Sequence, residues 1–104
     1  MSEKKLQQQI LKAIGSDPNY RLFRNNVGML LDAKGNPVRY GLCKGSSDLI
    51  GMKKIKITPE MVGIDIAQFV SIEIKAKNGK LTHEQKNWLD MVNEMGGLGF
   101  VIYE

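Results

Sequence analysis

Apolar residues near the start of the chain recur at three- and four-residue spacing, which is the period of one face of an α-helix. These residues are Leu6, Ile10, Ala13 and Ile14. Ser2 precedes them in the position of an N-cap, where a hydroxyl can accept a hydrogen bond from an unpaired helix N–H group. Gly15 and Pro18 follow and disfavour further helix. The pattern therefore predicts a first helix between Ser2 and Gly15.

A series of short strand patterns follows this helix. Residues 20–26 mix aromatic, apolar and basic side chains in the way of a strand. Residues 27–31 and 37–42 flank Asp-Ala-Lys-Gly-Asn, and a turn-rich connection of this kind suggests a hairpin. Residues 48–52 form another short strand candidate after Gly45-Ser46-Ser47, and residues 55–57 follow before a break at Thr58-Pro59.

The longest strand signal covers residues 64–77. Because successive side chains on a strand point to opposite faces, alternation divides this segment into two sets. One face carries Ile64, Ile66, Val70, Ile72, Ile74 and Ala76. The other face carries Phe69, Ser71, Glu73, Lys75 and Lys77. The segment ends at Asn78-Gly79, a turn sequence.

A second helix and a last strand complete the chain. Thr82 is the expected helix cap, and Gly96-Gly97 closes the helix. Its apolar stripe consists of Trp88, Leu89, Val92 and Met95. Residues 98–103 then form a strand. A strand, a helix and a strand in succession predict a right-handed parallel crossover, which places the last strand beside the 64–77 strand.

These elements predict an α/β fold in which a mixed β-sheet is flanked by helices. Their order is a helix, three or four strands, a helix and a strand. No internal repeat, low-complexity tract or linker is present, so we expect residues 1–104 to form a single domain.

Composition narrows the class of protein. Hydrophobic residues are 42% and charged residues 25% of the 104 residues, as in globular proteins, and no apolar run is long enough to cross a bilayer. The N-terminal residues lack the apolar core of a signal peptide, so we expect a cytoplasmic protein with no membrane association. The net charge of +4 favours a polyanionic partner, although a solvated basic face also explains it.

Glu73 and Lys75 are the first candidates for chemistry, because residues two apart on a strand leave the sheet on the same side. A solvated strand face also alternates charges in this way. A strand before a crossover helix, however, is usually covered on both faces, so its charges need partners. A divalent cation shared with Asp48, which follows a glycine-serine turn, would supply one. Alternatively, Asp48 is a turn residue that makes a local backbone hydrogen bond.

Two helix residues share the apolar faces that we expect to pack. Gln85 lies three residues before Trp88, and Thr82-x-x-Gln85 also fits a capping box, so both a site role and a capping role are open. Glu3 precedes Leu6 by three residues, but an acid is also favoured in a first helical turn by the helix dipole.

Other residues are expected to be structural. Trp88 and the methionines fit a core, and the single Cys43 fits a small buried residue better than a nucleophile. No internal disulfide is possible. Lys44 precedes Gly45, so the segment is not a phosphate-binding loop of the nucleotide-hydrolase kind, and we expect no nucleotide cofactor.

Three segments together resemble the PD-(D/E)XK nucleases, and more narrowly the virus-type replication-repair nuclease (VRR-NUC) branch. They are Gly45-Ser46-Ser47-Asp48, Phe69-Val70-Ser71-Ile72-Glu73-Ile74-Lys75 and Leu81-Thr82-His83-Glu84-Gln85-Lys86. Glu3 with Gln7, and Arg24-Asn25-Asn26, extend the likeness over nearly the whole chain. Ser47 stands where the superfamily name has proline, a change common in this branch. The resemblance implies a restriction-endonuclease-like core of order αβββαβ.

The resemblance also implies residue roles. Asp48, Glu73 and the backbone carbonyl of Ile74 would bind Mg²⁺, with Mn²⁺ as a substitute, and Lys75 would be the catalytic lysine. Gln85 would order the site, and Glu3 would contribute through water or a second ion. Residues expected to contact DNA are Arg24, Asn26, Lys44, Ser46, Lys77 and Lys80.

Stand-alone members of this branch resemble phage-type enzymes that cut branched DNA such as four-way (Holliday) junctions, which implies a repair nuclease in a bacterial cell or a phage-infected host. Symmetric cutting of both strands needs two sites, so a homodimer is expected. Flap cleavage or nicking of duplex DNA is an alternative. Two other interpretations remain open. The basic residues could belong to a non-catalytic nucleic-acid-binding module, or the chain could be a structural subunit that has lost activity.

Overall fold

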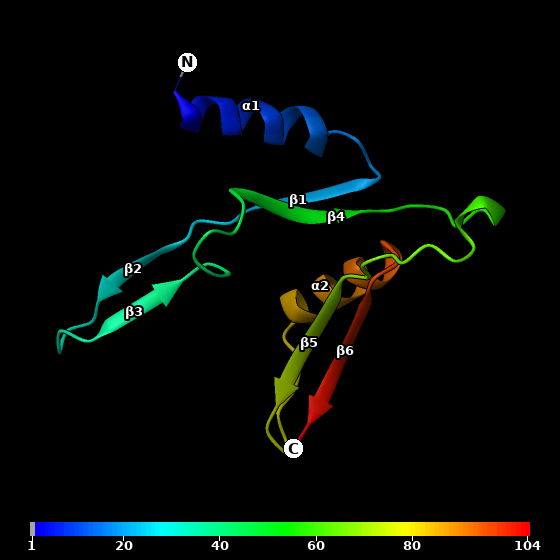
Figure 1. The fold of residues 1–104 in the computed structure, drawn as a ribbon. Helices are drawn as coiled ribbons and strands as arrows, with labels where there is room; N and C mark the ends of the chain where they lie inside the picture. Colours follow the sequence, from blue (N-terminus) through cyan, green and yellow to red (C-terminus); the bar gives the residue numbers. More distant parts are fainter. Residues whose placement is uncertain (1) are drawn as a thin grey trace. The chain divides into compact units, whose positions relative to one another are not determined.

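The computed structural model describes residues 2–104, which form a mixed α/β fold in two compact units. Unit 1 extends to Met52, and unit 2 is Lys53–Glu104. Their helices and strands are labelled in Figure 1. The expected class is confirmed, and the fold is compatible with a restriction-endonuclease-like architecture. The expectation of a single domain stays a prediction.

Unit 1 begins with the predicted helix, α1 (Glu3–Gly15). The Ser2 hydroxyl accepts a hydrogen bond from the Lys5 N–H group, as expected of an N-cap. Strand β1 (Tyr20–Arg24) pairs with β4 (Leu49–Lys53), whose first four residues end unit 1. The Asn25 N–H group donates to the Asp48 carbonyl, and Gly51 lies against the Arg21 backbone, so β1 and β4 run antiparallel.

The predicted hairpin lies between these two strands of unit 1. It pairs β2 (Gly28–Leu31) with β3 (Pro37–Tyr40) in antiparallel register. Asp32 forms the turn, because its Oδ1 accepts hydrogen bonds from the N–H groups of Lys34 and Asn36. Gly35 has a φ of +82°, a conformation that side chains disfavour.

Unit 2 contains a short 3₁₀ helix η1 (Pro59–Met61), then β5 (Val70–Lys75), α2 (His83–Glu94) and β6 (Leu98–Tyr103). Strands β5 and β6 pair in parallel over their full lengths, from Val70 beside Leu98 to Lys75 beside Tyr103. The parallel arrangement predicted from the strand, helix and strand succession is therefore confirmed.

Helix α2 packs closely against β6. Its Leu89 and Val92 side chains are buried, and Met95 just beyond the helix is buried with them. Two glycines of this region permit the close approach, because a Cβ atom at Gly97 would lie 2.8 Å from Val92 Cγ1 and one at Gly99 would lie 3.2 Å from Leu89 Cδ2. The core of unit 2 is thus formed where α2 crosses β6.

Within unit 2, helix α2 covers one face of β5 and leaves the other exposed. Ser71, Glu73 and Lys75 are half-buried, and the first two bond to side chains of α2. The apolar face is exposed, with exposed fractions of 50% for Val70, 46% for Ile72 and 75% for Ile74. Alternation in the sequence divided the two sets correctly, and the helix covers the polar one.

One strand prediction is wrong in extent. The strand predicted over residues 64–77 is limited to Val70–Lys75. A strand needs a partner for its backbone groups, and β6 supplies one only opposite Val70–Lys75. Five strands rather than three or four separate the helices, and within residues 2–104 the strands pair as three two-stranded sheets.

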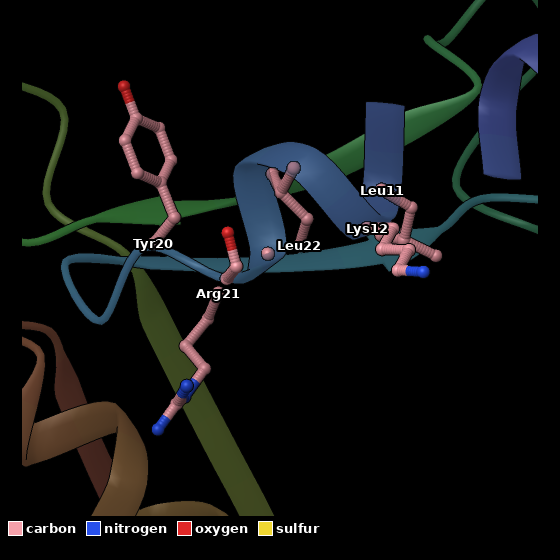
Figure 2. Close-up of a pocket in the computed structure, with 7 residues that line it drawn as sticks. Leu11, Lys12, Tyr20, Arg21 and Leu22 are labelled. Atoms are coloured by element: carbon pink, nitrogen blue, oxygen red, sulfur yellow. The ribbon is translucent and has the colours of Figure 1, made fainter. Parts of the chain in front are cut away.

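A cavity of about 420 Å³ lies in unit 1 between the C-terminal half of α1 and the start of β1 (Figure 2). Leu11, Lys12, Tyr20, Arg21 and Leu22 are among the residues that line it. None of the predicted site residues is among the residues that line this cavity.

No helix within residues 2–104 has the length and apolar character that a bilayer crossing requires.

Substitution of Gly97 tests the packing of α2. We expect Gly97→Ala to lower the free energy of unfolding by about 1–3 kcal/mol, because its Cβ would overlap Val92 Cγ1 and the Phe69 carbonyl oxygen. Urea unfolding followed by circular dichroism measures the change. Gly15→Ala is the control, since no atom lies within 4 Å of its Cβ, and alanine should be neutral or stabilise the end of α1 by up to about 1 kcal/mol. Equal effects of the two substitutions would contradict the packing account.

Candidate active site

Glu73 lies in the middle of β5 and points towards α2. Its Oε1 atom accepts a hydrogen bond of 2.8 Å from the Gln85 Nε2 group. The Glu73 side chain is 31% exposed, so the carboxylate is partly screened by the helix and still open to solvent. A bond to an ionised acceptor is stronger than one between neutral groups, so this contact restricts the carboxylate orientation.

Gln85 makes two kinds of hydrogen bond at once. Its Oε1 accepts from the Thr82 N–H group at 3.0 Å, which completes a capping box at the start of α2. Its Nε2 donates to Glu73. A backbone N–H can only donate, so the amide oxygen must face Thr82 and the amide nitrogen must face Glu73. The capping role, one of the two alternatives left open by the sequence, is therefore present, and the same amide also contacts Glu73.

Lys75 is the second charged residue on this face of β5. Its Nζ atom lies 3.7 Å from Glu73 Oε1, and its side chain is only 16% exposed. A lysine this buried needs a compensating charge, and Glu73 supplies one. Both Gln85 and Lys75 contact Oε1, so the Oε2 atom of Glu73 keeps its lone pairs for a further ligand.

The adjacent inward position on β5 is Ser71. Its Oγ accepts a hydrogen bond of 2.8 Å from the Trp88 Nε1–H group. The Trp88 and Phe69 rings make an edge-to-face contact with their centroids 6.5 Å apart. Trp88 and Gln85 are three residues apart and thus on one helix face. Trp88 therefore keeps α2 over the same face of β5 that carries Glu73.

The backbone carbonyl of Ile74 points away from β6. The Phe69 and Lys75 carbonyl groups accept hydrogen bonds from the N–H groups of Leu98 and Glu104. In a parallel pair, carbonyl groups of alternate residues point to the same side, so that of Ile74 points to the opposite edge of β5. No strand within residues 2–104 pairs with that edge. An oxygen ligand is thus available next to Glu73.

Asp48 and Glu3 belong to unit 1. Asp48 is exposed immediately before β4, and its backbone carbonyl accepts a hydrogen bond from the Asn25 N–H group. The alternative of a turn-forming bond from its carboxylate is not found within unit 1. Glu3 is exposed in the first turn of α1, where the helix dipole favours an acid.

The residues expected to contact DNA are divided between the units. Arg24, Asn26 and Lys44 are exposed and Ser46 is half-buried, all in unit 1. Lys77 and Lys80 are exposed in the turn between β5 and α2. Cys43, expected to be buried, is exposed.

The spacing of residues in the sequence did not indicate that Asn25 would be buried. Among the described residues it is the buried polar one, with an exposed fraction of 8%. Its position gave little indication of this, because an asparagine after a strand usually indicates an exposed turn.

The predicted ligand set consists of two carboxylates and one backbone carbonyl. Such an all-oxygen set is the type that Mg²⁺ prefers. No group of three or more His, Cys, Asp and Glu side chains suited to a metal ion was found within residues 2–104.

Comparison with known proteins decides the family. The model of the VRR-NUC domain matches residues 2–103, which is essentially the whole chain and spans both units. The chain belongs to the VRR-NUC domain family. VRR-NUC domains are PD-(D/E)XK nucleases, so the protein is of nuclease type and DNA is its implied substrate. Searches of curated proteins and of solved structures gave no match.

The two roles of Gln85 in this VRR-NUC domain can be separated by substitution. Thr82→Ala removes the N-cap and should lower the free energy of unfolding by about 0.5–2 kcal/mol without a specific loss of nuclease activity. Gln85→Ala removes its part of the cap and also the donor to Glu73, and should reduce nuclease activity by a further 10- to 100-fold or so. Urea unfolding and DNA cleavage, assayed where both variants are folded, measure the two effects. Equal activity of the two variants would contradict the assignment.

Proposed function

We propose that this VRR-NUC domain is a metal-dependent, structure-selective DNA endonuclease that hydrolyses phosphodiester bonds in branched DNA. One observation carries the proposal. A partly exposed carboxylate, Glu73, is held by Gln85 beside the half-buried amine of Lys75, in a chain of a nuclease family. A solvated strand face would not require this degree of burial and bonding.

Asp48, Glu73 and the Ile74 carbonyl are the proposed ligands of one Mg²⁺, with Mn²⁺ as a substitute. Their chemistry suits the ion, because Glu73 Oε2 and the Ile74 carbonyl are available and no local bond engages the Asp48 carboxylate within unit 1. A bound divalent cation supplies Lewis-acid polarisation of the scissile phosphate and lowers the pKa of a bound water.

The side chains around the ligands have separate tasks. Gln85 keeps the Glu73 carboxylate in one orientation, which limits reorganisation when the substrate binds. Lys75 positions the attacking water through its ammonium group and stabilises negative charge on the phosphate oxygens. Glu3 contributes from α1 through water or a second ion. Hydrolysis leaves a 5′ phosphate and a 3′ hydroxyl, as the family resemblance implies.

Binding of DNA is assigned mainly to phosphate contacts. The net charge of +4 and the exposed Arg24, Lys44, Lys77 and Lys80 favour a polyanion, and Asn26 adds hydrogen bonds to the phosphates. The hydroxyl of Ser46, also expected to contact DNA, already donates to the Cys43 carbonyl oxygen. Such contacts follow the shape of DNA more than its sequence.

Substitution of the three central residues tests the catalytic proposal. Asp48→Asn, Glu73→Gln and Lys75→Ala should each reduce cleavage of a labelled four-way junction by roughly 100- to 1,000-fold or more, because a ligand or a charge at the phosphate is lost. DNA binding, measured by gel shift with Ca²⁺, should remain. Chelation with EDTA should stop cleavage by the unmodified protein.

Lys86→Ala is the matched control for Lys75→Ala. Lys86 also pairs with a carboxylate, that of Asp90, but both side chains are more than half exposed and the pair should contribute little. Its cleavage rate should equal that of the unmodified protein. Full activity of all three site variants would contradict the proposed site. DNA binding without cleavage in any metal would indicate a binding module instead.

A homodimer is part of the proposal, since symmetric cutting of a four-way junction needs two sites related by a twofold axis. Sedimentation of the protein with and without junction DNA should give a dimer on DNA, and the junction should be cut faster than flap, nicked and linear duplex DNA of the same length. A monomer under both conditions would exclude junction resolution, and cleavage of flaps or nicking of duplex would then remain.

A further inference from the structure

Residues 42–48 of unit 1 are bonded to a single buried residue, Asn25. The Asn25 amide nitrogen donates to Ser46 Oγ at 2.7 Å and to the Ser47 carbonyl oxygen at 2.9 Å. Its amide oxygen accepts from the Leu42 N–H group at 3.1 Å. Its backbone N–H group donates to the Asp48 carbonyl oxygen at 2.8 Å. Asn25 is 8% exposed, so these bonds are largely protected from competition with water.

The orientation of this amide is determined by its partners. A carbonyl oxygen can only accept and a backbone N–H can only donate, so the nitrogen must face Ser47 and the oxygen must face Leu42. Ser46 adds a second connection, because its hydroxyl donates to the Cys43 carbonyl oxygen at 2.6 Å while accepting from Asn25. No other common side chain combines these donors and this acceptor at the same length.

Two of the four bonds act directly on Asp48. The Ser47 carbonyl belongs to the peptide group before the Asp48 Cα atom, and the Asp48 carbonyl belongs to the one after it. Both groups bond to Asn25, so the φ and ψ angles of Asp48 are restricted and mainly the side-chain torsions remain free. No such bond engages the Asp48 carboxylate within unit 1, so the arrangement orients the backbone and leaves the acid available.

We propose that Asn25 is a positioning residue for Asp48, acting by fixing the two peptide groups on either side of it. This inference rests on the proposed function, in which Asp48 is a ligand of the catalytic cation. Asn25 contacts neither cation nor DNA in this account. Because the backbone of Asp48 is already ordered, its carboxylate loses less conformational entropy when it binds the cation. Residues that bond to metal ligands without contacting the metal have this effect in other metal sites.

Cation binding in the absence of DNA tests the inference. Asn25→Asp keeps the size of the side chain and replaces the donor to Ser47 with an oxygen, which repels the Ser47 carbonyl. We expect the Kd for Mn²⁺, measured by titration calorimetry, to rise roughly 10- to 100-fold. An added carboxylate by its charge alone would lower this Kd, so a rise identifies a geometric effect.

Asn93→Asp is the matched control. The Asn93 amide in unit 2 also bonds to backbone groups, donating to the Gly99 carbonyl oxygen at 3.0 Å and accepting from the Gly99 N–H group at 2.8 Å. Its substitution should cost stability without a change in the Kd for Mn²⁺. Should Asn25→Asp fail to fold, Ser46→Ala carries the test, with a smaller rise in Kd, because it removes one acceptor of the Asn25 amide.

Asp48→Asn is measured alongside to separate two failures. One possible result is that Asp48→Asn abolishes Mn²⁺ binding and folded Asn25→Asp binds Mn²⁺ as tightly as the unmodified protein. This result would overturn the positioning role of Asn25 and leave the proposed function standing. If Asp48→Asn itself binds Mn²⁺ normally, the proposed cation site is overturned, and the role of Asn25 with it. Loss in Asp48→Asn together with weakening in Asn25→Asp, but not in Asn93→Asp, supports both.

Discussion

The hydrogen bond from Gln85 to Glu73 is the interaction on which the rest of the site depends. It joins the only polar face of β5 to the first turn of α2, and the same amide caps that helix. The start of the helix, the orientation of the acid and the environment of Lys75 are therefore coupled. The Gln85 side chain both accepts a hydrogen bond from an N–H group at the start of α2 and donates one to the Glu73 carboxylate. A change that disrupts the start of α2 should therefore also alter the orientation of Glu73.

The packing of unit 2 explains why charged groups can lie under a helix. Complete burial occurs at Val92, where glycines allow α2 and β6 to approach each other. Towards the N-terminal end of α2 the contact with β5 is made instead by polar pairs, Gln85 with Glu73 and Trp88 with Ser71. Paired polar groups tolerate burial that isolated ones do not. The half-buried amine and carboxylate are stable there because each has a partner.

Much of the fold could be predicted from the sequence because its elements carry local signals. The spacing of apolar residues and the caps predicted α1 and α2, and the turn sequence predicted the hairpin of β2 and β3. The extent of β5 could not be predicted in this way, since alternation continues to Ile64 but the partner strand does not. Which face of β5 is covered also depends on where α2 packs.

The candidate site was predictable only in part, for a related reason. Spacing placed Glu73 and Lys75 on one face and Gln85 on the packing stripe, and the structure brings these three together. The role proposed for Asn25 depends on bonds to residues 17 to 23 positions away in the chain, which no local period reveals. Asp48 and Glu3 lie in unit 1, and their part in the site is proposed from chemistry and family resemblance.

The proposed active site requires the carboxylates of Asp48 and Glu73 to bind one cation. A crystal structure of the Mn²⁺-soaked protein, with the ion located by its anomalous scattering, would show whether they do. We expect one Mn²⁺ in contact with oxygen atoms of both carboxylates and of the Ile74 carbonyl, at distances of about 2.0–2.2 Å. An ion bound by only one of the two acids, or carboxylates too far apart to share it, would rule out the proposed site.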